Sequence, residues 1–340
     1  MPRLIPIILI HGFDGLPTVW TESGFRQRLI AEGGLDPNLV RAFDYGVASD
    51  GTYNNRGDLR MIASRLAGAD LSPDERLLCS IDQLSENSVA RGGPPQVTII
   101  CHSLGGIISR YYLSRSAPDK WGTIYRGNVG RLITIGSPHR GVDLLRLTDL
   151  VPRGSLVWWF IRLLERLGLA PAMPATVARA LDHTLRQQQL AARRRVTPDG
   201  SPLPEERVLL TDTPIYAQLH PDSALLRELN RPGMMPKEVS CHTFYGDIRY
   251  NVRVRANSVT LVDQTVSFGD LVVAADSARN IPHARCGPRP FIDGKSISMT
   301  LRTGPAPEPR GLVEYLSDVS HNRQLANPDI QRAALEIVTA

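Results

Sequence analysis

The sequence lacks the features that mark several classes of protein. No apolar run in its 340 residues is long enough for a membrane-spanning helix, and no internal repeat is visible. The formal net charge is only +5, which does not indicate a nucleic-acid-binding protein. With a transmembrane segment, a repeat architecture and a nucleic-acid partner set aside, the length suits one large α/β domain with insertions, or two domains.

Cysteine is also scarce. The chain has four, Cys79, Cys101, Cys241 and Cys286, and none has the spacing of metal ligands. Cys101 and Cys241 lie in apolar, strand-like runs, so we expect each to be a small buried thiol. A disulfide that includes Cys79 or Cys286 is an open alternative.

We expect no signal peptide at the start of this sequence. Its first apolar stretch, residues 4–10, leads directly into His11 and Gly12, which is typical of a structural strand and not of a removable leader. We therefore expect an intracellular protein or the mature form of a secreted one. Pro6 lies within this stretch, so strand pairing should begin just after it.

Residues 96–116 carry the strongest signal for chemistry. Residues 97–101 form a short, continuous, β-branched apolar run, which predicts a buried strand. Apolar residues at helical spacing start at Leu104. Ser103 therefore lies in a sharp strand-to-helix turn, where Gly105 and Gly106 leave room for the crowded backbone.

A serine in such a turn is typical of a nucleophile. The turn lifts the hydroxyl out of the sheet, and the N–H of Leu104 at the positive end of the helix can stabilise an oxyanion. The usual pattern is G-x-S-x-G, and here Cys101 replaces the first glycine. The alternative is a core strand joined to a helix by small residues.

Strands alternate with helices over the first 141 residues. Helices are expected at 17–32, 57–69 and 73–90, and strands at 39–45 and 131–135, with Trp20, Phe25 and Leu29 facing the core in the first helix. Further strands are expected at 238–245 and 296–302, an extra strand or hairpin at 251–263, and a last helix from 329. The pattern predicts an α/β protein with a mostly parallel sheet flanked by helices.

The pattern changes at about residue 142. Residues 154–169 predict an apolar helix, 174–195 a second helix, and the proline-rich loop 197–205 closes the segment. We expect a core of residues 1–141 and 236–340 with a helical lid or cap at 142–235, and the helix 154–169 could contact a lipid interface transiently. A helical pair that simply packs on the core is the alternative.

A serine hydroxyl needs a base to take its proton, and that base needs an orienting carboxylate. Ser103, Asp270 and His321 occur in the order nucleophile, acid, base. Asp247, beside a glycine at another strand end, is an alternative carboxylate. Asp270 is favoured because the apolar residues 272–273 would anchor its loop on the core.

Three other histidines lie in loops at the same end of the predicted sheet. His102 is next to the serine, so its ring is expected to point away from the hydroxyl. His139 is expected to structure its loop, and His11 lies just after the first strand. His321 is preferred as the base because it is the last histidine, after the acid and before the closing helix.

Five stretches of the sequence carry a family resemblance. They are Ile-Leu-Ile-His-Gly-Phe-Asp-Gly at 8–15, the serine turn at 97–106, Leu-Ile-Thr-Ile-Gly-Ser-Pro-His-Arg-Gly at 132–141, the stretch 269–278 that opens Gly-Asp-Leu-Val-Val, and residues 320–328. Together they resemble the lipase group of α/β-hydrolases, close to bacterial lipases, lecithin:cholesterol acyltransferase-like enzymes and the inositol deacylases of lipid anchors. The resemblance covers most of the sheet but not residues 142–235.

The resemblance implies an α/β-hydrolase fold and a serine hydrolase of lipid-like esters. Matched residue by residue, Ser103 would be the nucleophile, Asp270 the acid and His321 the base, with the N–H groups of Phe13 and Leu104 as the oxyanion hole. Such chemistry needs neither a metal nor an organic cofactor. Acyl transfer or phospholipase activity by the same triad, and a non-catalytic lipid-binding protein on this fold, are the alternatives.

Overall fold

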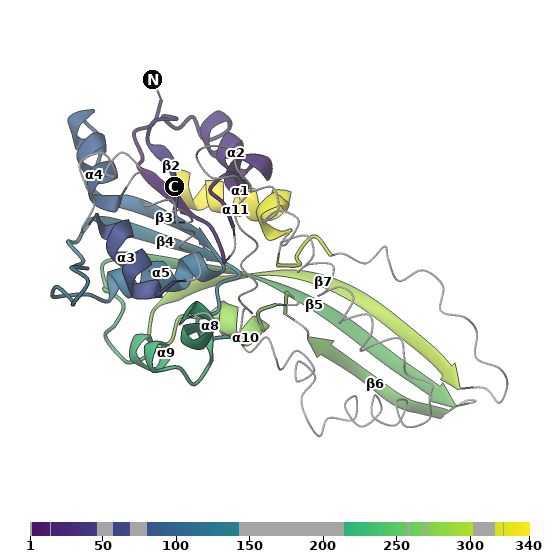
Figure 1. Cartoon of the computed structure of the whole chain (residues 1–340). Helices are drawn as coiled ribbons and strands as arrows, with labels where there is room; N and C mark the ends of the chain where they lie inside the picture. The colour runs from purple at the N-terminus through teal and green to yellow at the C-terminus, as the bar shows by residue number, and fades with distance from the viewer. Residues whose placement is uncertain are drawn as a thin grey trace, which may run out of the picture.

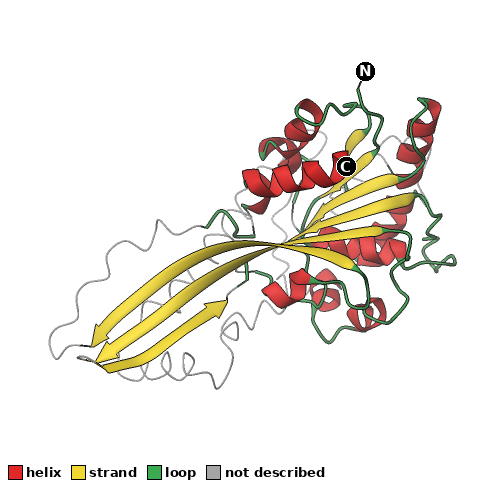
Figure 2. Cartoon of the chain, turned by 180° about the vertical axis from the view of Figure 1, so that it is seen from behind, coloured by secondary structure: helices red, strands yellow, loops and turns green. Residues whose placement is uncertain are grey.

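The computed structural model describes residues 2–13, 15–45, 57–68, 80–142, 214–256, 259–267, 269–270, 272–301, 317–321 and 323–340. These residues form one seven-stranded sheet with helices on both faces (Figures 1 and 2). The strand order is β2-β1-β3-β4-β5-β6, and β7 pairs with β5.

The strands are β1 (Ile7–Ile10), β2 (Val40–Phe43), β3 (Val97–His102), β4 (Val129–Ile135), β5 (Ser240–Ala256), β6 (Val259–Ser267) and β7 (Cys286–Leu301). All neighbours pair in parallel except β5 and β6, which are antiparallel. The predicted α/β class with a mostly parallel sheet is therefore confirmed.

The helices are α1 (Val19–Glu22), α2 (Phe25–Ala31), α3 (Leu59–Ala67), α4 (Ile81–Ala90), α5 (Leu104–Leu113), α8 (Pro214–Leu219), α9 (Ala224–Leu229), α10 (Ala275–Arg279) and α11 (Pro328–Thr339), with a short 3₁₀ turn η4 (Gln324–Ala326). Parallel strands need such crossover segments between them, and these place helices on the sheet faces.

The core has two layers, one on each face of the sheet. Ile8 and Ile10 of β1 pack with α3, α4, α5, α8 and α9, whereas Ile7 and Leu9 pack with α1, α2 and α11. This division follows from the two-residue period of a strand. All four side chains are fully buried, as expected for a parallel strand covered on both faces.

The helix expected at 17–32 is two helices. Trp20, Phe25 and Leu29 are all buried as predicted, but Gly24 lies between α1 and α2 with φ +75°. That left-handed conformation cannot continue a right-handed helix, and glycine adopts it without steric cost. The chain therefore turns at Gly24 and presents both short helices to the same face.

Beyond the other strands, β5, β6 and β7 continue as a three-stranded extension of the sheet (Figures 1 and 2). The predicted hairpin at 251–263 is present as the antiparallel end of β5 with β6. The strand expected at 296–302 instead begins at Cys286 and contains Pro288 and Pro290. Among the described strands β7 pairs only with β5, and an edge strand tolerates prolines because one row of its N–H groups has no partner strand.

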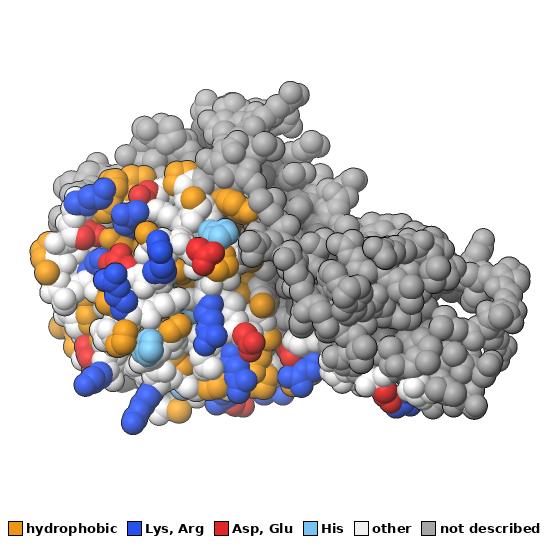
Figure 3. Space-filling model, turned by 90° about the horizontal axis from the view of Figure 1, so that it is seen from below, with side chains coloured by type: hydrophobic (Ala, Val, Ile, Leu, Met, Phe, Trp, Pro, Cys, Tyr) orange, Lys and Arg blue, Asp and Glu red, His pale blue; other side chains and the backbone are white. Residues whose placement is uncertain are grey.

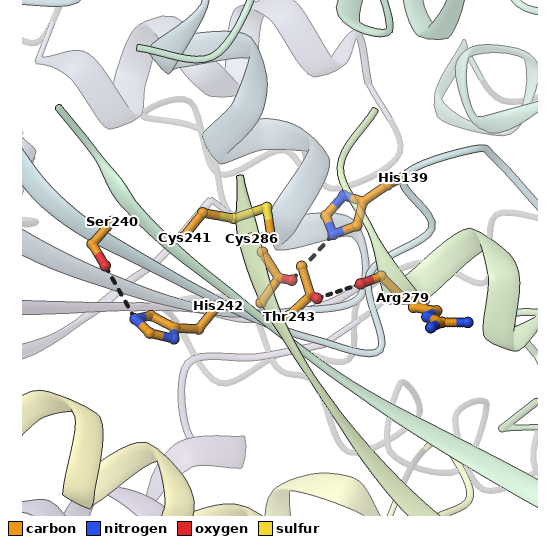
Figure 4. The surroundings of a disulfide bond; sticks show 8 residues. His139, Ser240, Cys241, His242, Thr243, Arg279 and Cys286 are labelled. Carbon is orange, nitrogen blue, oxygen red and sulfur yellow. Dashed lines mark hydrogen bonds between the residues drawn. A yellow bond between two sulfur atoms is a disulfide. The ribbon is translucent and has the colours of Figure 1, made fainter. Parts of the chain in front are cut away.

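Cys241 and Cys286 form a disulfide, so the prediction of a free thiol at Cys241 is wrong. The two residues are direct neighbours in the register of β5 and β7, near the start of both strands (Figure 4). Cys101 is a buried free thiol as expected. Cys79 lies outside the described residues. The pairing needed the register of two parallel strands, which spacing along the chain does not reveal.

The two helices expected at 154–169 and 174–195 lie outside the described residues, so the lid and the three-part division of the chain stay predictions. Helices α8 and α9, from the end of the expected insertion, pack in the same core layer as α3 and α5. None of the helices that the structure describes is long and apolar enough to span a bilayer. On the face seen in Figure 3, lysine and arginine side chains are interspersed with acidic and apolar ones.

Candidate active site

Ser103 is the single residue between β3, which ends at His102, and α5, which begins at Leu104. Its backbone has φ 53° and ψ −122°, a conformation that residues other than glycine rarely adopt. The Ser103 N–H donates to the carbonyl of Ile135 on β4 at 2.9 Å, which holds the turn against the sheet. The predicted sharp strand-to-helix turn is therefore present.

Gly105 is required by close packing of this turn. A methyl group on Gly105 would lie 2.6 Å from the carbonyl oxygen of Ile10 and 2.9 Å from that of His11. The helix thus begins directly against the carboxyl end of β1. The loop after β1 and the serine turn are held side by side, although about 90 residues separate them in the sequence.

The structure brings Ser103, His321 and Asp270 together. Nε2 of His321 lies 2.8 Å from Oγ of Ser103, and Nδ1 of His321 lies 2.7 Å from Oδ2 of Asp270. A carboxylate only accepts, so Nδ1 carries the proton and donates to Asp270, which leaves Nε2 to accept from the serine hydroxyl. The three residues are 9%, 4% and 1% exposed, so water screens these bonds little.

The carboxylate of Asp270 accepts four hydrogen bonds. Oδ1 accepts from the N–H groups of Val272 at 3.0 Å and Val273 at 2.7 Å. Oδ2 accepts from His321 and from Nε2 of Gln324 at 2.9 Å. In addition, the His321 N–H donates to the carbonyl of Asp270 at 2.9 Å, so backbone and side chain both join the two loops. Val273 is buried, as expected for an anchor of this loop.

Asp247, the alternative carboxylate, lies within β5 and is also buried. Its Oδ2 accepts from Nε of Arg249 at 2.5 Å, and its Oδ1 accepts from the hydroxyl of Ser267 at 2.5 Å. Asp247 therefore joins β5 to the end of β6. The carboxylate beside His321 is Asp270.

The other loop histidines have different partners. Nε2 of His102 donates to the backbone carbonyl of His321 at 3.0 Å, so its ring lies against the residue predicted to be the base. Burial holds the pKa of His102 well below its ordinary value, and the charge of His321 lowers it further. His139 is fully buried, and its Nε2 pairs with the hydroxyl of Thr134 at 3.1 Å, in keeping with a residue that structures its loop.

Two backbone donors near the serine, one in the loop after β1 and one at the start of α5, have no acceptor among the described residues. Neither Phe13 nor Leu104 donates its N–H to another described residue. The Gly12 carbonyl, in the same peptide unit as the Phe13 N–H, accepts from the hydroxyl of Tyr45 at 2.7 Å and from Nδ1 of His11 at 3.0 Å. In a trans peptide the C=O and N–H point in opposite directions, so these bonds fix the direction of the Phe13 N–H.

Two residues of this site, Gln324 and Tyr45, are not marked by any pattern in the sequence. Gln324 is a lone amide in a short turn, three residues after His321, and nothing in that spacing marks a role. Tyr45 follows β2 and reads as an ordinary core aromatic; it is fully buried, with its ring stacked on His11 at 4.0 Å between centroids. No cluster of described residues has the composition of a metal site.

No model of a known protein family matches the sequence, and no curated protein matches it. Among solved structures, the chain has distant similarity to lipase 1 from Pelosinus fermentans, at 14% identity and a TM-score of 0.45, over 99% of this chain and 98% of that one. Lipase BlEst2 from Bacillus licheniformis in mature form has 15% identity and a TM-score of 0.42, over 100% and 94%. EstA from Clostridium botulinum has 12% identity and a TM-score of 0.44, over 100% and 88%.

Proposed function

We propose that this protein is a serine ester hydrolase that acts on lipid-like esters. The observation that carries the proposal is the continuous pair of hydrogen bonds from Ser103 through His321 to Asp270, 2.8 and 2.7 Å long. A serine, a histidine and a carboxylate in this buried arrangement provide a nucleophile, its base and the group that orients the base. The lipid-like substrate class comes from the sequence resemblance alone.

The reaction has two halves. Oγ of Ser103 attacks the ester carbonyl while Nε2 of His321 takes the hydroxyl proton, and Asp270 stabilises the imidazolium that forms. His321 then returns the proton to the leaving alcohol, and the acyl group stays on Ser103. Water, deprotonated by His321, then attacks the acyl-enzyme. His321 returns that proton to Oγ of Ser103 as the bond between Oγ and the acyl carbon breaks, which releases the carboxylic acid and restores the serine.

The negative charge that develops on the carbonyl oxygen of the ester during the attack must be stabilised by hydrogen-bond donors. We assign this role to the N–H groups of Phe13, in the loop after β1, and Leu104, in the first turn of α5, which have no other described partner. The helix dipole of α5 adds positive potential at Leu104. Removing one such donor typically lowers kcat by about 10²–10³.

A series of nitrophenyl esters from C2 to C16 acyl chains, with a fluorophosphonate probe, tests the proposal. We expect turnover and labelling by the purified chain, and loss of both in Ser103→Ala. Ser114→Ala is the matched control, since Ser114 caps the opposite end of the same helix. Full activity in Ser103→Ala would refute the proposal, and the preferred chain length reports on the substrate class.

The two carboxylates give a second comparison. Asp270→Asn should lower kcat about 10⁴-fold because the amide cannot hold the required tautomer of His321. Asp247→Asn should leave kcat close to that of the original protein. It should change the free energy of unfolding, because it alters the hydrogen bonds that Asp247 accepts from Arg249 and Ser267. A loss of kcat that is larger in Asp247→Asn than in Asp270→Asn would show that the assignment of Asp270 as the acid is wrong.

A further inference from the structure

We propose that Gln324 is a positioning residue for this reaction: its side-chain amide fixes the carboxylate of Asp270 and, through it, the ring of His321. The inference rests on the proposed function, since it concerns how the acid and base are held. Gln324 would not touch substrate. It would set the orientation and the basicity of groups that do.

The direction of the Gln324 amide follows from its partners. Nε2 lies 2.9 Å from Oδ2 of Asp270 and 3.2 Å from the carbonyl oxygen of Val319. A carboxylate and a carbonyl both only accept, so the nitrogen and not the oxygen must face them. Both N–H bonds of the amide are thus used inside the protein, and the side chain is fully buried.

The contact matters because of the carboxylate oxygen to which Gln324 donates. Oδ2 is the same oxygen that accepts from His321, whereas Oδ1 is held by two backbone N–H groups. Without Gln324, Oδ2 would have His321 as its one described donor. A carboxylate with fewer donors is more basic, and it raises the basicity of the imidazole that it faces.

The surrounding packing leaves little room for a substitute donor. Gly136, after β4, has φ +58°, and a methyl group there would lie 3.0 Å from Oδ2 of Asp270 and overlap the Gln324 amide. A methyl group on Gly246 of β5 would lie 2.8 Å from Nε2 of Gln324. A glycine after β4 and a glycine within β5 thus allow the amide of Gln324 and the carboxylate of Asp270 to meet.

Among the described residues, few charged or titratable groups lie near the contact of Gln324 with Asp270. His321 faces Asp270 directly, and the ring of His102 lies 4.7 Å from that of His321. On β5, next to Gly246, Asp247 is paired with Arg249. In the loop of Gln324 itself, Asp318 pairs with Arg323 at 3.0 Å, and both are largely exposed. A carboxyl group placed at position 324 would therefore interact mainly with Asp270 and His321.

Two variants separate positioning from simple packing. Gln324→Met keeps the length of the side chain but has no donor, so kcat should fall about tenfold while KM changes less than about twofold. The acid limb of the kcat profile should move to higher pH, because the imidazole of His321 becomes more basic. Gln324→Glu can donate from a protonated carboxyl but not from an ionised one.

For Gln324→Glu, the activity relative to the original protein should therefore fall as the pH is raised and two carboxylates come to face each other. Gln331→Met is the matched control. Gln331 is also buried, and its Nε2 donates to the carbonyls of Ser23 and Leu325 and not to Asp270 or His321. It should lower thermal stability and leave the pH profile unchanged.

The outcomes are distinct. A pH-dependent loss in Gln324→Glu together with a shifted acid limb in Gln324→Met, absent in Gln331→Met, supports the inference. Unshifted profiles in both Gln324 variants, with Ser103→Ala inactive, overturn it and leave the proposed function intact. Activity in Ser103→Ala overturns both. If Gln324→Met does not fold, the pH series of Gln324→Glu, normalised to folded protein by circular dichroism, decides alone.

Discussion

Gly12 lies directly against Ser103: a methyl group on Gly12 would lie 2.9 Å from Cβ of the serine and 3.0 Å from Nδ1 of His102. Carbon atoms do not approach that closely without a shift of the backbone. The glycine therefore sets the distance between the loop after β1, which carries the Phe13 N–H, and the turn that carries Ser103.

Gly12→Ala should displace this loop, because the serine turn is held on both sides by β3 and α5. The Phe13 N–H would leave its position, and kcat should fall about 100-fold, as for other losses of an oxyanion donor. Steady-state kinetics on a short-chain ester measures this. Gly294→Ala is the control, since nothing lies within 4 Å of its added methyl. A kcat within twofold of the original protein in Gly12→Ala would contradict the assignment of Phe13.

Stability should fall as the pH drops below about 6.5. Burial holds the pKa values of His102 and His139 well below the ordinary value, with nearby His321 and Arg110 lowering them further. In the unfolded chain both histidines titrate near 6.5, so below that pH the unfolded state binds protons that the folded state does not. The free energy of unfolding is unaffected above this pH and falls below it by up to about 1.4 kcal/mol per pH unit for each histidine.

Urea unfolding at pH 7.5, 6.5 and 5.5 measures this slope. His139→Gln removes one of the two titrating groups, so its stability should depend less steeply on pH than that of the original protein, whatever its absolute value. Parallel slopes for the two proteins would show that His139 binds a proton in the folded state.

The disulfide between Cys241 and Cys286 should contribute substantially to stability. Its ends are 45 residues apart, and the loop that it closes contains Asp270. The chain-entropy model gives about 4 kcal/mol for a loop of that length. Replacing both cysteines by serine should lower the free energy of unfolding by an amount of that order. A reductant should destabilise the original protein and not the serine variant; equal sensitivity of the two would exclude the bridge.

Local patterns predicted much of this protein correctly. The strand, turn and helix around Ser103 are visible in the sequence because an apolar run, small residues and a helical repeat follow one another within some twenty residues. The two-residue and 3.6-residue periods likewise predicted the strands at the sheet centre and the closing helix α11. The structure differs from these predictions at single backbone positions, such as the left-handed Gly24 that divides the helix expected at 17–32.

What the sequence determined by itself is the α/β class and the place of the serine, since both depend on neighbouring residues and on short-range steric limits. The tertiary structure alone decided that Asp270 and not Asp247 faces His321, that Cys241 pairs with Cys286, and that Gln324 and Tyr45 lie behind the site. Those contacts join residues that are 33 to 54 positions apart along the chain. They depend on strand order and register, which no local period encodes.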